Sequence, residues 1–350
     1  MAPAVLQDFH NIGYHFLAKS TASKQRTVTP TQVRGPVTNP FTPPPSRFEP
    51  LCHPLEKQIT KEVDGFFLTH WPFKTEKDRK KFVAAGFSRV TCLYFPLAKD
   101  DRIHFACRLL TILFLIDDLL EDMSFDEGSA YNEKLIPIAR GNVLPDRNIP
   151  VEWIMYDLWE SMRAHDKALA DGILEPTFTF MRSQTDKARL TIREMGEYLD
   201  YREKDVGKAL LCALMRFSMA LNVSPEEIAS VQPVEKNCAK HLAVLNDILS
   251  WDKEYLAYQT GHPEGSAICS AVQVLSDETS LPFSASKRVL WHMCREWEIQ
   301  HSYLVEKRET DTAFPPSANL TAYMKGLEYQ ISGNELWSKT TLRYNSLTTA

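Results

Sequence analysis

The most constraining feature of this chain is the segment Phe105–Ile116, which is apolar except for Arg108 and Thr111 and leads directly into Asp117-Asp118-Leu119-Leu120-Glu121. A helix that is apolar on all sides lies in a protein interior, with other helices around it. The apolar run is shorter than the roughly 20 residues that a membrane-spanning helix needs. The segment therefore predicts a bundle of helices without a membrane span, in which one buried helix ends in acidic residues.

Helical patterns continue through most of the chain from Leu55 onward, and no alternating strand runs bounded by tight turns are found. We therefore predict one large all-α domain, with loops at residues 121–150 and 308–317. Serine caps such as Ser224, which precedes Pro225-Glu226-Glu227, mark helix starts. Helices are expected at residues 55–69, 75–88, 100–121, 151–170, 173–184, 187–202, 206–220, 225–230, 235–256, 264–276, 284–307 and 318–342.

The beginning of the chain differs in composition from the rest. Nine of the 21 prolines fall within the first 54 residues, and the run Thr42-Pro43-Pro44-Pro45-Ser46 lies near the end of this stretch. Segments rich in proline and small polar residues bury too little apolar surface to fold. We predict a disordered tail over residues 1–50 and a folded domain over residues 51–350.

The net charge and the cysteine content limit the classes of function that are compatible with this sequence. The net charge of -5 and the absence of a long basic block argue against a nucleic-acid partner, because nucleic-acid surfaces of proteins are basic. The 7 cysteines are odd in number, scattered and mostly set among apolar neighbours. This pattern is typical of reduced, buried thiols and predicts a cytoplasmic enzyme rather than a disulfide framework or a zinc site.

The acidic residues after the apolar segment are one candidate site. Asp117, Asp118 and Glu121 are spaced so that one helical turn brings their carboxylates together. An acidic helix end is often only a solvated terminus. Here, however, the acids follow the apolar run without a polar transition, and negative charge at a helix C-terminus opposes the helix dipole. Bound cations would compensate the negative charge that follows the apolar run and would also offset its unfavourable interaction with the helix dipole.

A second candidate site lies in the predicted helix 235–256. Asn246, Ser250 and Glu254 recur every four residues, so they form one line on a helix face beside apolar positions. The pattern is also compatible with the polar edge of an ordinary amphipathic helix. Amide, hydroxyl and carboxylate oxygens are nevertheless the ligands that Mg²⁺ prefers. Together the two groups predict a magnesium site at the mouth of an apolar cavity, suited to a phosphate-containing substrate.

The two segments resemble the D-D-x-x-[DE] and N-D-x-x-S-x-x-x-E motifs of class I terpene synthases, the second without an insertion. The resemblance runs from about Leu51 to Tyr344 and is closest to the aristolochene synthases of fungi. Stretches that are similar to these enzymes are Val90–Pro96, Asp101–Leu110, Tyr156–Asp166 and Gly326–Glu335.

The resemblance implies a class I terpenoid synthase helical bundle around a deep apolar cavity, with the cyclase domain at residues 51–350. It implies Mg²⁺-dependent cyclisation of farnesyl diphosphate through germacrene A to aristolochene, with release of diphosphate and the use of three Mg²⁺ ions. A different bicyclic or monocyclic sesquiterpene is the alternative product. The oligomeric state is left open by the sequence, a homo-oligomer included.

The resemblance also implies roles for individual residues. Asp117 would bridge metal ions, with Asp118 and Glu121 in supporting roles, while Asn246, Ser250 and Glu254 would hold a third ion. Residues expected to bind the diphosphate are Arg202, Lys253, Arg343 and Tyr344. Aromatic residues expected to line the cavity are Tyr94, Phe114, Phe180 and Trp337, and Tyr94 is also a candidate proton donor.

Three other functions are alternatives to this one. A chain-elongating prenyl diphosphate synthase would carry a second aspartate-rich motif where this chain has Asn246, Ser250 and Glu254. A ferritin-like di-iron protein needs two Glu-x-x-His pairs, and the chain has only Glu298-x-x-His301. A non-catalytic helical scaffold would have no need of this spacing of oxygen ligands, and it would not respond to Mg²⁺.

Overall fold

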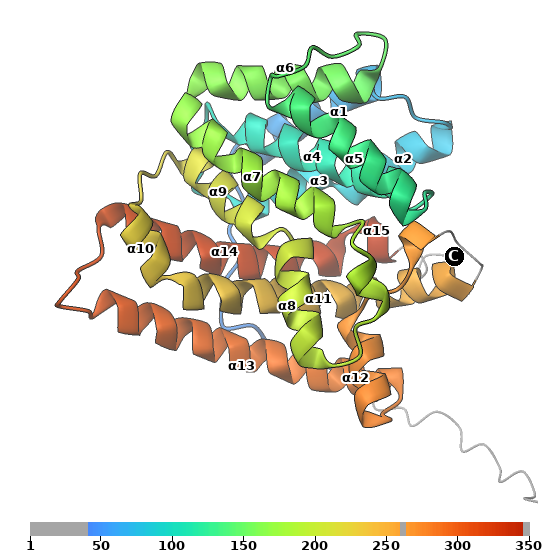
Figure 1. Cartoon of the computed structure of the whole chain (residues 1–350). Helices are drawn as coiled ribbons and strands as arrows, with labels where there is room; N and C mark the ends of the chain where they lie inside the picture. The colour runs from blue at the N-terminus through green and yellow to red at the C-terminus, as the bar shows by residue number, and fades with distance from the viewer. Residues whose placement is uncertain (1–40, 260–263, 346–350) are drawn as a thin grey trace, which may run out of the picture. The chain divides into compact units, whose positions relative to one another are not determined.

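The computed structural model describes residues 41–259 and 264–345, and this part of the chain is helical without a strand, which confirms the all-α prediction (Figure 1). The helices are α1 (Glu56–His70), α2 (Glu76–Ala85), α3 (Phe87–Tyr94), α4 (Ile103–Leu120), α5 (Phe125–Ala139), α6 (Pro150–His165), α7 (Lys167–Ser183), α8 (Met195–Asp205), α9 (Lys208–Met219), α10 (Pro225–Ser230), α11 (Gln232–Gln259), α12 (Ala271–Thr279), α13 (Phe283–Glu309), α14 (Ala318–Thr340) and α15 (Leu342–Asn345), with the 3-10 turns η1 (Lys187–Leu190) and η2 (Glu264–Ser266). No helix within the described ranges is long and apolar enough to cross a membrane.

The predicted interior helix is α4. It packs against α1, α3, α6 and α9, and 11 of its 18 residues are buried. Burial on several sides follows from a sequence that is apolar almost all round, because each exposed face would leave apolar surface in water. The packing of α4 fixes the position of its C-terminal end, where Asp117, Asp118 and Glu121 are half-buried.

The long helices α11, α13 and α14 form the other part of the framework. In Figure 1, α11 lies between α13 and α14, and it contacts both. Helix α14 also packs closely on α3: a Cβ on Gly333 would approach the carbonyl oxygen of Leu93 to 2.5 Å, so only glycine fits there. This close contact brings the middle of α14 next to the C-terminal end of α3.

An ion network joins α13 to α14. Arg295 of α13 donates from Nη2 to Glu335 Oε1 at 2.7 Å and from Nη1 to Glu335 Oε2 at 2.8 Å. Arg295 also binds Glu298, which accepts a hydrogen bond from the Arg47 backbone N–H at 2.7 Å. Residues 42–50 belong to the predicted tail. Phe48 is buried among them, whereas the part of that prediction on residues 1–40 lies outside the described residues.

Several sequence-based boundaries are wrong. The predicted helix 75–88 is divided at Gly86 between α2 and α3, and α12 begins at Ala271 rather than at residue 264. The predicted loop at 121–150 contains α5, which begins with a capping box in which Ser124 and Glu127 exchange side-chain and backbone hydrogen bonds. The predicted break between 170 and 173 lies instead at Asp166, whose side chain accepts from the Leu169 N–H and caps α7. Helix α7 then continues through Pro176. In both of these places a capping side chain, that of Ser124 or Asp166, marks the start of the helix.

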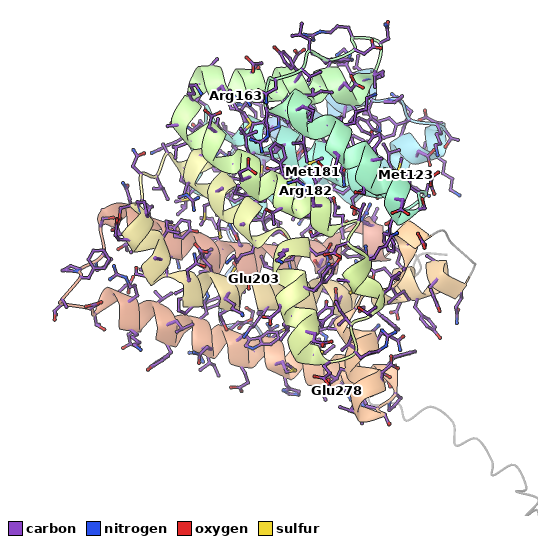
Figure 2. All side chains as sticks on the ribbon, viewed as in Figure 1. Met123, Arg163, Met181, Arg182, Glu203 and Glu278 are labelled. Atoms are coloured by element: carbon purple, nitrogen blue, oxygen red, sulfur yellow. The ribbon has the colours of Figure 1, made fainter. Side chains whose placement is uncertain are left out.

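Helix α8 packs against α7, α9, α11 and α12. Its first N–H group, that of Met195, donates to the Glu278 carboxylate of α12 at 3.1 Å, and Figure 2 labels Glu278 in that region. Helix α8 is shorter than the predicted helix 187–202, because residues 187–190 form η1 and the helix proper begins at Met195. This arrangement places the C-terminal half of α8 against α11.

Candidate active site

Three carboxylates converge at the end of α4. One oxygen from each of Asp117, Asp118 and Glu121 lies within 4.8 Å of the others, in a spacing that suits a metal ion. The grouping follows from local structure, because α4 continues to Leu120 and Glu121 occupies its C-cap. The sequence-based expectation that these three acids come together therefore agrees with their positions in the structure.

Asp117 is the least compensated acid of the three. Its Oδ1 accepts a hydrogen bond from Gln184 Nε2 at 2.7 Å. Withdrawal from bulk water, together with the negative charges of Glu121 and Asp118, raises the pKa of Asp117 to about 7 despite the opposing positive charge of Arg343. A carboxylate in such surroundings is stabilised in its ionised form when a cation binds.

Asn246, Ser250 and Glu254 lie along α11. Asn246 donates from Nδ2 to the Tyr344 hydroxyl at 2.9 Å, which leaves its Oδ1 as an acceptor. Ser250 is fully buried, and within the described residues its Oγ has no hydrogen-bond partner. Buried hydroxyls are nearly always paired, so an orphaned Oγ beside other oxygen ligands fits a site that takes a cation. Asn246 and Glu254 line the cavity described below, and Ser250 lies between them in the sequence of α11 without being part of the lining.

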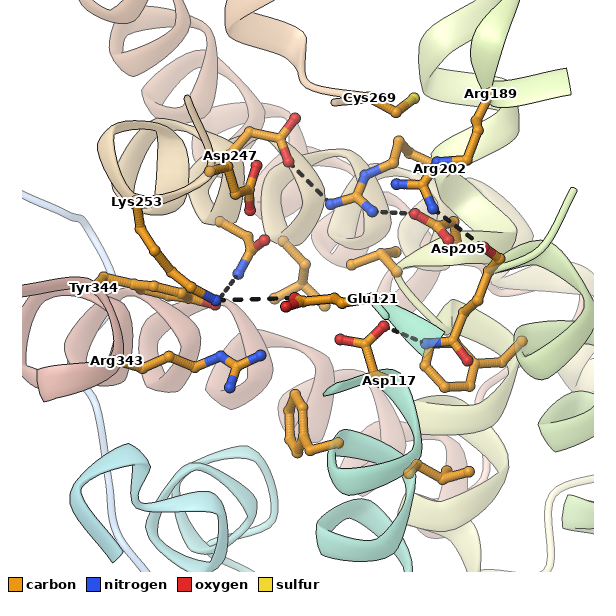
Figure 3. A pocket seen from close by; sticks show the side chains of 18 of the residues that line it. Asp117, Glu121, Arg189, Arg202, Asp205, Asp247, Lys253, Cys269, Arg343 and Tyr344 are labelled. Carbon is orange, nitrogen blue, oxygen red and sulfur yellow. Dashed lines mark hydrogen bonds and ion pairs between the residues drawn. The ribbon is translucent and has the colours of Figure 1, made fainter. Parts of the chain in front are cut away.

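The expected cationic donors border the same site (Figure 3). Arg202 of α8 donates to Asp247 Oδ1 at 2.9 Å and also binds Asp205. Arg343 donates to Asp118 Oδ1 at 2.7 Å. These bonds join basic groups to acids of the site itself, so each could be exchanged for a bond to a bound anion.

Lys253 and Tyr344 complete this set of donors. Lys253 Nζ lies 3.9 Å from Glu121 Oε1, which is an ion pair without a close hydrogen bond. Tyr344 follows Arg343 in α15, and burial raises the pKa of its hydroxyl to about 12. A hydroxyl with so high a pKa keeps its proton and acts as a hydrogen-bond donor at neutral pH.

A cavity of about 260 Å³ lies behind these polar groups. Its lining includes the four predicted aromatic residues, Tyr94, Phe114, Phe180 and Trp337. Phe114 and Trp337 lie with their ring centroids 6.3 Å apart, and Trp337 donates from Nε1 to the Ala85 carbonyl at 2.9 Å, which fixes its ring. The lining of the cavity thus combines acids, bases and aromatic rings.

Tyr94 uses its hydroxyl within the protein. The hydroxyl donates to Asn334 Oδ1 at 2.8 Å, and Asn334 in turn donates to the Leu242 carbonyl at 3.2 Å. Burial raises the pKa of Tyr94 well above its ordinary value. The proton is therefore both engaged and hard to remove, and this hydroxyl is poorly suited to act as an acid toward a ligand.

The segment of residues 264–269, here called the strap, contacts the end of α4. Gly265 N–H donates to the Met123 carbonyl at 2.9 Å, and Ser266 Oγ donates to the Glu121 carbonyl at 2.7 Å. A Cβ on Gly265 would lie 2.0 Å from the Leu120 carbonyl oxygen, so a larger residue would push the strap away. The strap residues 265–269 line the cavity and lie beside its acidic end.

Sequence reasoning missed several polar residues that line the cavity, among them Gln184, Arg189, Asp205 and Asp247. Asp205 could have been found from its spacing of three residues after Arg202, since such pairs share a helix face. Asp247 stands inside the second motif. It binds Arg202 and accepts the Ala271 N–H at 2.6 Å. Gln184 and Arg189 follow the end of α7, and no local pattern marks them.

Comparisons with known proteins show which proteins this chain resembles. Residues 108–300 match the family model described as "Terpene synthase family 2, C-terminal metal binding". The chain is 64% identical over 303 residues to aristolochene synthase of Aspergillus terreus, covering 87% of this chain and 94% of that protein. It is 62% identical over 304 residues to (+)-aristolochene synthase TS1 of Penicillium expansum, covering 87% and 91%.

Solved structures show the same likeness. The crystal structure of aristolochene synthase from Penicillium roqueforti has a TM-score of 0.77 at 60% identity, and the match covers 86% of this chain and 100% of that one. Hedycaryol synthase in complex with HEPES has a TM-score of 0.71 at 16% identity, covering 86% and 99%, which shows a shared fold alone.

Proposed function

The chain belongs to the terpene synthase family, and from this premise we propose that it is a sesquiterpene cyclase that converts farnesyl diphosphate into aristolochene and diphosphate. Curated relatives at 62–64% identity, matched over 87% of the chain, carry the name of this product. One observation carries the proposal: oxygen ligands, cationic donors and aromatic rings face the same cavity. That combination suits a substrate with an anionic head and a long apolar chain.

The metal site fits a divalent cation, and Mg²⁺ is the ion we propose. The donors are carboxylates, an amide oxygen and the unpartnered hydroxyl of Ser250, all of them hard oxygen ligands that Mg²⁺ prefers. We assign Asp117, with Asp118 and Glu121, to one side of the site and Asn246, Ser250 and Glu254 to the other, for three ions in all. When bound, Mg²⁺ would supply positive charge that stabilises the leaving diphosphate.

Arg202, Lys253, Arg343 and Tyr344 act on the same diphosphate as fixed donors. In this structure Arg202 and Arg343 form ion pairs with acids of the site. A bound anionic ligand competes for the arginines, and its cations compete for the acids. Donors aimed at a leaving group lower the barrier to its departure because its charge grows in the transition state. The allylic carbon–oxygen bond then ionises without a nucleophile.

The cavity protects and directs the carbocation. Aromatic faces attract a cation by about 2 kcal/mol or more when water is excluded, and Phe114, Phe180 and Trp337 are held along the wall. The strap and the apolar lining keep water from adding to the cation. Tyr94 acts through its ring, because its hydroxyl donates to Asn334. The basic oxygens of the released diphosphate are then the groups that take up the proton lost to form germacrene A.

The proposal is tested by gas chromatography–mass spectrometry of hydrocarbons formed by the purified full chain from farnesyl diphosphate and Mg²⁺. We expect a single main product that co-elutes with authentic aristolochene and disappears when EDTA is added. A main product that is another bicyclic or monocyclic hydrocarbon would correct the product but keep the cyclase. Absence of any hydrocarbon from farnesyl, geranyl and geranylgeranyl diphosphate would contradict the proposed function.

A further inference from the structure

Gln184 connects the end of α7 to the acidic end of α4. Its side chain is 7% exposed, and Nε2 donates to Asp117 Oδ1 at 2.7 Å. The amide is oriented with its nitrogen toward the carboxylate, because the reverse orientation would bring two acceptor oxygens together. Among the described residues, Gln184 at the C-cap of α7 donates the hydrogen bond that the Asp117 carboxylate accepts from outside α4. Figure 3 shows this bond as a dashed line to Asp117.

The backbone of Gln184 is itself held in place. Its N–H donates to the Phe180 carbonyl at 3.3 Å, and its carbonyl accepts from Arg189 Nη1 at 3.1 Å. Arg189 uses Nη2 to bind the Ala267 carbonyl of the strap at 3.3 Å. One guanidinium thus ties Gln184 to the segment that lies over the acidic end of α4. A side chain with its backbone fixed on both sides can hold its partner in one orientation.

The hydrogen bond selects which carboxylate oxygen of Asp117 is free. Oδ1 is engaged by Gln184, so Oδ2 is left for another partner. In the described part of the chain, Gln184 Oε1 is buried without a hydrogen-bond partner, which leaves an acceptor next to the acid group. Side chains that orient a ligand in this way typically change metal affinity or activity by about 10–100-fold when removed.

We infer that Gln184 is a positioning residue that orients Asp117 for binding of a divalent cation, and that it thereby sets the cation requirement of the enzyme. The inference rests on the proposed function, since it assigns Asp117 to a cation site. Gln184 acts through Asp117, to which it donates its hydrogen bond. Arg189 supports it by fixing the Gln184 carbonyl to the strap.

Asn132 offers a matched control. Its Nδ2 donates to the Met181 carbonyl of α7 at 2.7 Å, it is 1% exposed, and within the described residues its Oδ1 has no partner (Figure 2 labels Met181). Gln184 and Asn132 are therefore both buried amides with one bonded nitrogen and one unbonded oxygen near the end of α7. They differ in that only Gln184 binds an acid of the cavity.

The experiment compares wild type, Gln184→Met, Asn132→Leu and Asp117→Asn as full chains in two Mg²⁺ titrations. The first follows steady-state turnover of farnesyl diphosphate. The second follows thermal unfolding in the presence of inorganic diphosphate, without turnover. We expect Gln184→Met to raise the Mg²⁺ concentration at half-effect about 10–100-fold in both titrations. At saturating Mg²⁺ its kcat should return toward the wild-type value.

The control variants distinguish a failure of the role inferred for Gln184 from a failure of the proposed function. Asn132→Leu should lower the melting temperature of the metal-free protein and leave both Mg²⁺ midpoints unchanged. Wild-type midpoints in Gln184→Met, together with a loss of response in Asp117→Asn, would overturn the role of Gln184 and keep the proposed function. A wild-type protein that forms no hydrocarbon and is not stabilised by Mg²⁺ with diphosphate would contradict the proposed function itself.

Discussion

In the described part of the chain, two clusters with acidic residues have ligand atoms close enough to hold a metal ion, and they differ in how the protein compensates their charge. The core cluster consists of His241, Glu298 and Glu335, and the mouth cluster consists of Asp117, Asp118 and Glu121. All members of the core cluster are buried, whereas those of the mouth cluster are half-buried beside the cavity. Similar spacing of acids thus occurs in two settings with different consequences.

The core cluster is closed by the protein's own groups. Burial raises the pKa of Glu335, but hydrogen bonds from Arg295 and Lys339 outweigh burial and lower it overall. Burial likewise raises the pKa of Glu298, and bonds from His241 and the Arg47 N–H turn the net direction downward. A buried acid with a lowered pKa is already stabilised as an anion, so this cluster joins helices and needs no metal.

The mouth cluster is left incompletely compensated. Arg343 binds Asp118 and Lys253 lies 3.9 Å from Glu121, while the pKa of Asp117 is raised to about 7. Perturbed acids in a cavity are typical of functional sites, because the missing charge is supplied by a ligand. Spacing alone therefore does not distinguish a structural cluster from a cation site. What distinguishes them here is that the core acids are held by buried hydrogen bonds from Arg295, whereas the mouth cluster lies half-buried beside the cavity.

Removal of Arg295 should have the largest effect. Arg295→Met leaves Glu298 and Glu335 buried without their shared cation, and breaking a buried ion pair typically costs about 3–5 kcal/mol of unfolding free energy. Urea unfolding of the metal-free protein measures this loss. Arg147→Met, which breaks the exposed pair with Asp157, should shift the midpoint little. Equal shifts in the two variants would mean that the core cluster is not a stabilising network.

Removal of the charge of Asp117 should affect turnover and spare the fold. A metal ion contributes several kcal/mol to the transition state, so Asp117→Asn should lower kcat/KM about 10²–10³-fold, or about 3–4 kcal/mol. The metal-free unfolding free energy should not fall, because the acid lost is one that burial disfavours. Steady-state kinetics and urea unfolding measure the two effects. A variant with wild-type turnover would contradict the assignment of Asp117 as a ligand.

The fold was predictable where capping residues and apolar periodicity agree. Ser224 with Glu227 forms the capping box of α10, and that helix has the predicted bounds of 225–230. Helix α5 has the same kind of capping box, yet its sequence includes Gly128 and Pro137 and lacks a strong apolar stripe. Its burial against α6 and α7 stabilises it, and such tertiary contacts are invisible to a local pattern.

The site was predictable where its residues share one helix. Asn246, Ser250 and Glu254 recur every four residues, and helical geometry alone places them in line. Gln184 and Arg189 reach the acidic end of α4 only because α7, η1 and the strap meet there, so their positions depend on tertiary structure. Partner acids such as Glu298 looked like half of a di-iron motif, and only the position of Arg295 reveals their structural role.

Ligand addition should stabilise the protein through the candidate active site, to which the mouth cluster belongs, and not through the core cluster. Mg²⁺ with inorganic diphosphate at about a hundredfold excess over Kd should add about 2.7 kcal/mol to the unfolding free energy of wild type. Arg295→Met should show the same increase in unfolding free energy, added to a lower ligand-free value, because the core cluster does not bind the ligand. Thermal unfolding with and without ligand measures both increments. An increment that disappears in Arg295→Met would place the cation response at the core cluster.

Acidification should act on the core cluster, and its effect is the smallest considered. The pKa of Glu335 is lowered in the folded protein, so its stabilising contribution is present above its ordinary pKa and is lost as the pH falls through the lowered value. The groups that face this carboxylate are Arg295 of α13 and Lys339 of α14, and Arg295 links it to Glu298 and thus to His241 of α11.

In Glu335→Gln this pH-dependent contribution is absent. The difference in unfolding free energy between wild type and Glu335→Gln should therefore be greatest near pH 7 and shrink below about pH 4.5, as measured by urea unfolding in metal-free buffers. A difference that stays constant over this range would show that Glu335 gains no stabilisation as an anion, and the contrast between the two clusters would then rest on geometry alone.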